Sequence, residues 1–389
     1  MCTLIEIFDA KQYENIITPI NLDIKKVIYV GTKEVMTDGK IRDIHRFFDR
    51  INHKVSLEFY YVERDNEQSI ENRLTQIVKN NPDAVFDATG GEDVILTSVG
   101  VISERFSVPV IRTDVKTKKH IPVHGKPVNI APKSIPLGIF DLITLQGGQV
   151  ISSDNIDSFT DEDVATLKSV FEVNSHNPEA FIAMCGAVSE FLSADGKTLL
   201  ISKELFEKNA TRSRRDIYPV FNLLTEKNLI TKIDEDEKTV TYKTKSHIVS
   251  MCLKKSGNAL EYYTAIAMAE INGLTDIKVG VQIEWESGKK YFETQNEIDV
   301  MAVSSSLPVF VSCKNGEVRK EALYELDSVS RALGGTYAKK ILVCTYLSKN
   351  ASSRERILER ARDMGIEVIF NTHTKPFERF IYYLNRTTS

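Results

Sequence analysis

Short apolar runs alternate with longer amphipathic runs over the first 113 residues, and this alternation constrains the fold more than any other feature of the chain. The apolar runs predict strands, at 4–8, 26–30, 54–62, 83–88 and 109–113. The amphipathic runs predict helices, at 38–51, 68–80 and 94–106. Strands that alternate with helices through short connections favour a parallel sheet, so we predict an α/β fold of the doubly wound type. Ligands of such sheets bind at the carboxyl ends of the strands.

The bulk composition excludes several classes of protein. A chain of 389 residues is long enough for about two or three domains. Its net charge of -4 argues against a general nucleic-acid coat protein, so contacts with DNA or RNA have to come from local patches. The five cysteines form no C-x-x-C pair, which fits a reducing compartment and excludes a zinc ribbon. There is no secretory signal and no apolar run of the roughly 18 residues that a membrane span needs, so we expect a cytoplasmic protein without a membrane partner.

Charged residues stand at defined places on two apolar runs between 295 and 316. Glu297 and Asp299 are two residues apart, so they point to the same face of a strand. Lys314 ends the second run, where a hairpin brings it beside Asp299. Two carboxylates and a lysine can hold a divalent metal and activate a water, which suffices for metal-assisted phosphodiester hydrolysis. A surface hairpin with a salt bridge has the same spacing and remains the alternative.

The sequence of this stretch resembles the core of the PD-(D/E)xK nucleases. It reads N-E-I-D-V, followed by an apolar strand that ends in C-K. In particular it is similar to the nuclease half of the CRISPR-associated Rossmann-fold (CARF) effectors, ancillary nucleases of type III CRISPR systems that cyclic oligoadenylates activate. The resemblance implies a restriction-endonuclease-like α/β domain over 255–389 and an N-terminal Rossmann-like CARF domain over 1–150.

The resemblance also assigns roles to residues of the nuclease half. It implies a Mn²⁺ or Mg²⁺ ion with Asp299 as central ligand, Glu261 on the first helix as second ligand and the Cys313 carbonyl as third. Lys314 is then the catalytic lysine, which orients the attacking water and stabilises the charged transition state. Glu297 is either a further ligand or a residue that steers the pocket.

Three side chains near this motif have alternative interpretations. Ser312 stands where the nuclease superfamily usually has an acid, so either the remaining ligands hold the metal or the activity is weakened. Glu325 on the following helix either reaches the metal or lies on a solvated face. Cys313 alternates with Lys314 along the strand, so we expect a thiol buried in the core and not a nucleophile.

Two loops that follow predicted strands form the expected ligand site of the N-terminal domain. Paired glycines let a backbone approach a ligand closely, and threonine hydroxyls can donate to phosphate or ribose. A plain tight turn has the same sequence. The resemblance adds the loop after the first strand, and the residues expected to contact the ligand are Asp9, Gln12, Thr32, Lys33, Thr89, Gly90 and Gly91.

The ligand that the resemblance implies is cyclic tetra-adenylate, shared by the two protomers of a homodimer across a two-fold axis. Glu92 and Asp93 follow the glycines, and two acids disfavour a polyanion unless they turn away from it. The sequence therefore predicts the sensor fold more firmly than the identity of its ligand.

The segment 151–254 is expected to be a connector followed by a winged-helix-like unit. The pattern predicts helices, at 160–172, 178–192, 203–209 and 213–227, and a strand pair, at 229–233 and 239–244. The basic cluster at 208–215 either contacts phosphates or belongs to a rigid spacer between the two ends of the chain.

Together these patterns predict a metal-dependent endonuclease that cleaves DNA and/or RNA and is activated by cyclic tetra-adenylate. One alternative is a ligand-responsive winged-helix transcription regulator, which has no use for the Asp299 and Lys314 pair. The others are an ungated nuclease of the resolvase or restriction type and an inactive scaffold.

Overall fold

The computed structural model describes residues 3–126, 128–203, 212–285, 295–348, 350–370 and 377–388. By their internal contacts these residues divide into two units. The first consists mainly of the described residues up to Val150, with short later pieces at 284–285, 295 and 332–337. The second contains 151–283, 296–331 and the rest of the chain from Ala338.

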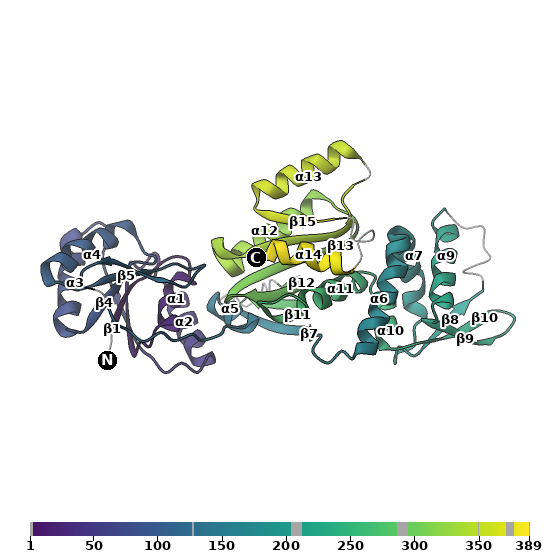
Figure 1. Ribbon diagram of the computed structural model, residues 1–389, viewed down its shortest axis with the longest axis horizontal. Coiled ribbons are helices and arrows are strands. Elements are labelled where there is room, and N and C mark those ends of the chain that lie inside the picture. Colours follow the sequence, from purple (N-terminus) through teal and green to yellow (C-terminus); the bar gives the residue numbers. More distant parts are fainter. Residues whose placement is uncertain are drawn as a thin grey trace. The chain divides into compact units, whose positions relative to one another are not determined.

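A six-stranded sheet in the order β3-β2-β1-β4-β5-β6 forms the centre of the first unit (Figure 1). Its strands are β1 (Thr3–Ile7), β2 (Lys26–Gly31), β3 (Ser56–Tyr61), β4 (Ala84–Asp87), β5 (Val110–Thr113) and β6 (His120–His124). β1 to β5 pair in parallel and β6 is antiparallel to β5. This is the doubly wound arrangement that the sequence predicted.

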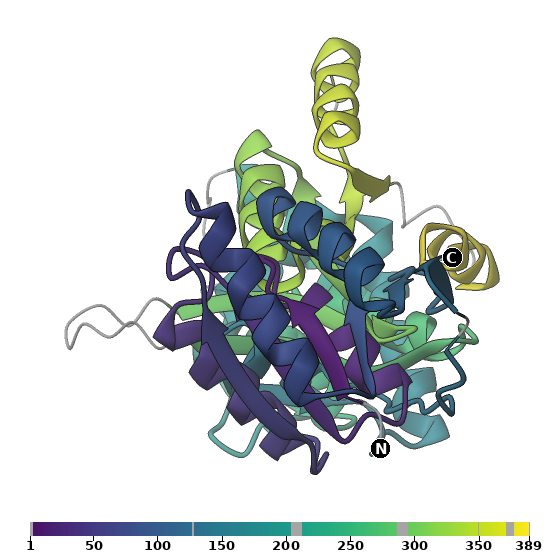
Figure 2. The same cartoon turned by 90° about the vertical axis from the view of Figure 1, so that its left-hand side faces the viewer.

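Helices cover both faces of this sheet, as the views in Figures 1 and 2 show. They are α1 (Glu14–Asn21), α2 (Asp38–Arg50), α3 (Glu67–Asn80), α4 (Asp93–Phe106) and α5 (Ile139–Leu145). Apolar side chains of α3 and α4 pack against β1, β2 and β4 in one buried cluster. The sequence pattern missed α1, because this helix has only eight residues and contains Pro19, a residue that usually ends a helix.

The second unit has its own six-stranded sheet, in the order β15-β14-β13-β12-β11-β7. Its strands are β7 (Gly148–Asn155), β11 (Leu274–Trp285), β12 (Gln295–Ser304), β13 (Leu307–Glu317), β14 (Lys339–Tyr346) and β15 (Ile366–Ile369). β12 and β13 form an antiparallel hairpin, whereas β13, β14 and β15 are parallel. The helices of this part are α11 (Asn258–Ala269), α12 (Lys320–Gly334), α13 (Ala351–Asp363) and α14 (Phe377–Thr388).

The segment between β7 and α11 is winged-helix-like, with helices on a small antiparallel sheet of order β8-β10-β9. Its elements are α6 (Asp161–His176), α7 (Pro178–Val188), β8 (Thr198–Ser202), α9 (Arg212–Glu226), β9 (Ile230–Glu235), β10 (Thr239–Thr244) and α10 (His247–Lys254). The helix predicted at 203–209 lies outside the described residues, apart from its first residue. Buried side chains of α6, α7 and α10 share one apolar cluster with α11 and β13, so the winged-helix-like segment is packed onto the six-stranded sheet of the second unit.

The described parts of the chain contain no helix that combines the length and the apolar character needed to cross a bilayer.

A substitution of Gly91 tests the backbone conformation of its loop in the first unit. Its φ is 119°, and a Cβ atom at this position would lie 2.3 Å from Ile7 Cγ2. We expect Gly91→Ala to destabilise the loop and its surroundings by about 1–3 kcal/mol, seen as faster hydrogen exchange of the β1 and β4 amides. Gly100→Ala is the matched control, because that glycine lies in α4 with open space around it and alanine favours a helix. Equal exchange in the two variants would contradict the strain assigned to Gly91.

Candidate functional site: a carboxylate and lysine cluster

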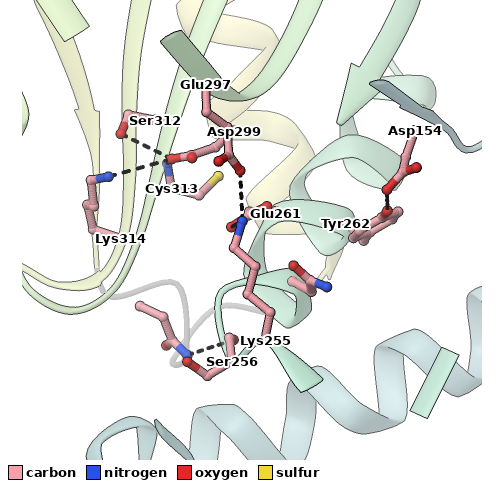
Figure 3. Close-up of polar contacts among 12 residues, drawn as sticks. Asp154, Lys255, Ser256, Glu261, Tyr262, Glu297, Asp299, Ser312, Cys313 and Lys314 are labelled. Carbon is pink, nitrogen blue, oxygen red and sulfur yellow. Dashed lines mark hydrogen bonds and ion pairs between the residues drawn. The ribbon is translucent and has the colours of Figure 1, made fainter. Parts of the chain in front are cut away.

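The antiparallel register of β12 and β13 fixes the position of Asp299. Val300 pairs with Val311, which places Asp299 opposite Ser312. The Asp299 Oδ2 atom accepts hydrogen bonds from the Cys313 N–H at 2.6 Å and from the Ser312 hydroxyl at 3.2 Å. The Lys314 Nζ lies 3.7 Å from the same oxygen (Figure 3). The structure thus brings Asp299 and Lys314 together as the hairpin pattern predicted, and Ser312 supports Asp299 where an acid would repel it.

Glu261 enters the cluster from the first turn of α11. Its side chain is only 5% exposed. Burial, and next the charge of Asp299, raise the pKa of Glu261 to about 7. Gly257 makes room for this carboxylate, because a Cβ there would lie 2.6 Å from Glu261 Oε1. Glu261 therefore faces the other acidic residues, as the resemblance implied.

Lys255 also belongs to the cluster, although no sequence pattern pointed to it. Its Nζ lies 2.8 Å from Glu297 Oε1 and 3.7 Å from Glu261 Oε1 (Figure 3). Burial alone would lower the pKa of Lys255, but the hydrogen bond to Glu297 and the charges of Glu261 and Glu297 outweigh it and raise this pKa. The one sequence signal is its position, three residues before the helix that carries Glu261.

A hollow with about 370 Å³ of empty space, open solvent included, lies beside Asp299. Glu297, Ser312, Lys314 and Glu325 also line it. Glu325 comes from α12 and is exposed to solvent at this hollow. The hollow has room for a reacting group next to Asp299 and Lys314.

Cys313 is buried, and its Sγ lies 3.7 Å from the Thr264 hydroxyl. Burial raises the pKa of this thiol well above its usual value. These observations confirm that Cys313 is a core residue and not a nucleophile. Its backbone N–H, in contrast, holds Asp299.

The donor atoms of the cluster fit a hard divalent cation, because Mg²⁺ and Mn²⁺ prefer carboxylate and carbonyl oxygens. Within the residues that the structure describes, however, no three His, Cys, Asp or Glu side chains converge closely enough to hold a metal. Instead, Lys314 is paired with Asp299, and Lys255 with Glu261 and Glu297. Two lysine cations thus face three carboxyl groups, of which Glu261 has its pKa raised to about 7.

In the first unit, the expected ligand loops are held by hydrogen bonds among themselves. Asp9 Oδ2 accepts from the Gly91 N–H at 2.7 Å. Gly90 lies against the Asp9 side chain, whose Cβ is 2.9 Å from where a Cβ of residue 90 would be. The Thr89 hydroxyl donates to Asp87 and accepts from the Thr113 N–H. Asp9, Thr89, Gly90 and Gly91 therefore form one connected loop cluster at the carboxyl ends of β1 and β4.

The other expected ligand residues divide into two kinds. Thr32 and Gln12 are buried and used internally: Thr32 donates to Glu92 at 2.6 Å, and Gln12 donates to the Lys40 carbonyl at 3.2 Å. Lys33 is exposed and lies over the Tyr61 ring, with its Nζ 5.6 Å from the ring centroid. Lys33 is thus the more accessible of these residues.

The carboxylate of Glu92 is paired with a positively charged side chain. Arg64 Nε lies 3.2 Å from Glu92 Oε1. Because both Thr32 and Arg64 contact this carboxylate, its repulsion of an anionic ligand is reduced.

Comparisons with known proteins show what the overall fold and the second unit are similar to. Residues 253–382 match the family model described as "Card1-like, endonuclease domain". This part of the chain is therefore similar to Card1-like endonuclease domains, which confirms the resemblance of its sequence to the nuclease half of CRISPR ancillary effectors. No curated protein matches the chain.

Two solved structures share the fold over the whole chain. The crystal structure of protein VC1899 from Vibrio cholerae has a TM-score of 0.77 at 14% identity, and the match covers 100% of this chain and 99% of that one. Can2 from Sulfobacillus thermosulfidooxidans, in complex with cyclic tetra-adenylate, has a TM-score of 0.70 at 14% identity, with 100% of both chains covered. These likenesses confirm the predicted α/β fold, with a Rossmann-like N-terminal unit, a winged-helix-like segment and a second α/β sheet.

The raised pKa of Glu261 predicts how stability depends on pH when no metal is added. In the unfolded chain this carboxyl loses its proton near its usual value of 4.5, whereas the folded protein keeps the proton up to about pH 7. Stability should therefore fall as pH rises from about 4.5 to about 7 and then level off. Thermal unfolding in EDTA should show this decline for the wild type and a flatter profile for Glu261→Gln. Glu270→Gln, an exposed residue just after the same helix, should follow the wild type; identical profiles for all three proteins would contradict the raised pKa.

Proposed function

We propose that the chain is a metal-dependent endonuclease of CRISPR antiviral defence, which cleaves DNA and/or RNA when cyclic tetra-adenylate binds to its N-terminal unit in a homodimer. The observation that carries the proposal is the pairing of Asp299 with Lys314 on adjacent strands of a Card1-like endonuclease domain. The full-length likeness to Can2, whose structure contains cyclic tetra-adenylate, supports the choice of activator.

In this proposal Asp299, Glu261 and the Cys313 carbonyl would hold Mn²⁺ or Mg²⁺, and Glu297 would be a further ligand. The metal, when bound, lowers the pKa of a coordinated water and neutralises charge on the phosphate. The chain supplies the orientation, because the Cys313 N–H and the Ser312 hydroxyl fix Asp299 before any ligand arrives. Lys314 places a positive charge where the pentavalent phosphate gains negative charge.

Ser312 has a defined part in this arrangement. An acid at this position would add a second negative charge directly across from Asp299, whereas the serine donates a hydrogen bond to it. The site therefore has one carboxylate fewer for the metal and a more firmly oriented Asp299. Of the two interpretations of Ser312, we favour the one in which the remaining carboxylates hold the metal over the one in which the activity is weakened.

The sensor role rests on the loop cluster of Asp9, Thr89, Gly90 and Gly91 at the carboxyl ends of the parallel strands, the edge where such sheets bind ligands. Lys33 and Arg64 line one open hollow with the start of α3, and the acids Glu34, Glu63 and Asp65 line it too. A polyanionic ring is the kind of ligand that such an edge would accept.

The first experiment is a cleavage assay of supercoiled plasmid, single-stranded DNA and RNA in Mn²⁺ or Mg²⁺, with and without cyclic tetra- and hexa-adenylate. Cleavage that requires one ring and a metal supports the gated nuclease. Cleavage without a ring would indicate an ungated enzyme, and no cleavage under any condition would favour the regulator or the scaffold.

Separation-of-function variants test the residue assignments. We expect Asp299→Asn and Lys314→Met each to reduce cleavage by at least about a thousandfold while binding of radiolabelled cyclic tetra-adenylate stays unchanged. Lys33→Met and Thr89→Val should weaken ring binding and activation. Glu321→Gln, an exposed position at the start of α12, is the control and should cleave like the wild type. Full activity of Asp299→Asn would overturn the active-site assignment.

A further inference from the structure

Lys255 lies on the short connection between α10 and α11, outside the hairpin that carries the motif. Figure 3 shows its side chain extended toward Glu261 and Glu297. The ammonium is within 2.8 Å of one carboxylate and 3.7 Å of the other, so a single cation is shared by two acids. The oxygens of these acids are donors of the type that a divalent metal prefers.

We propose that Lys255 is a positioning residue whose ammonium occupies the cation position between Glu261 and Glu297, and that the divalent metal has to displace it to bind. The inference rests on the proposed function, because it concerns the metal site of the same nuclease unit. In the absence of metal, the ammonium of Lys255 reduces the mutual repulsion of the two acids.

The backbone of Lys255 is held in place, which leaves its side chain as the part that moves. The Asn258 N–H donates to the Lys255 carbonyl at 3.0 Å. The neighbouring Ser256 carbonyl accepts from the Asn315 side chain at 3.2 Å, and Asn315 also donates to Asn174 of α6 at 2.9 Å. The connection is thus tied both to the residue after Lys314 and to the connector helix.

The side chain of Lys255 can rotate away from the two carboxylates into solvent. It is 53% exposed, whereas the Glu261 side chain is 5% exposed. Rotation of the flexible lysine stem is therefore sufficient to release the two carboxylates, and no backbone change is needed. Once displaced, the ammonium remains near the site, where it can contact a phosphate of the substrate.

Metal binding then exchanges one positive charge for two, and the lysine competes with the metal. We expect Lys255→Met, which keeps the length of the stem and removes the charge, to bind Mn²⁺ about tenfold more tightly than the wild type. Lys255→Arg retains the charge and should bind Mn²⁺ no more tightly than the wild type. Lys254→Met is the matched control, since it makes the same substitution at the exposed neighbouring residue and should not change the affinity.

The measurement is a Mn²⁺ titration of the full chain without substrate or activator, followed by the electron paramagnetic resonance signal of free Mn²⁺ and by calorimetry. Tighter binding by Lys255→Met alone, with Lys255→Arg and Lys254→Met like the wild type, supports the proposal. Unchanged or weaker binding by Lys255→Met overturns it, and so does an equal gain in Lys254→Met.

Asp299→Asn distinguishes failure of this inference from failure of the proposed function. If the wild type binds Mn²⁺ and Asp299→Asn does not, the metal site stands whatever Lys255→Met does. If neither the wild type nor Lys255→Met binds Mn²⁺, the metal site itself is wrong and the inference falls with it. Mn²⁺ binding that appears only in Lys255→Met supports displacement in its strongest form.

Discussion

The hydrogen bond from the Cys313 N–H to Asp299 is the interaction on which the nuclease site depends. It exists because β12 and β13 pair in one register, with Val300 opposite Val311. A slip of one residue would turn Asp299 to the other face of the sheet and away from Lys314. The buried apolar residues that alternate with the charged ones fix this register, so the packing of the sheet determines the chemistry at its surface.

Charge balance is the second constraint, and it appears in both units. Asp299 is paired with Lys314, and Glu297 with Lys255, while in the first unit Arg64 is paired with Glu92. Carboxylates in partly buried positions are costly unless cations or N–H groups compensate them. In the proposed function these internal partners are also the groups that an incoming metal or anion must displace or supplement.

The sequence was most informative where the pattern is local. Alternating apolar runs predicted the parallel strands of the first unit, and the period of two along 295–316 predicted that Asp299 lies next to Lys314. The short helix α1 was missed because it contains Pro19. Non-local features were not predictable from local patterns: β7 joins a sheet whose other strands begin more than a hundred residues later. Lys255 was missed for the same reason, because only the folded chain brings a connecting segment to Glu297.

The most direct test of the account is anomalous diffraction from crystals soaked in Mn²⁺. The account predicts one strong peak within coordination distance of the Asp299 and Glu261 carboxylates and the Cys313 carbonyl, with the Lys255 side chain moved away from Glu261. A peak at another place, or no peak at this cluster in crystals of protein that cleaves nucleic acid, would contradict it.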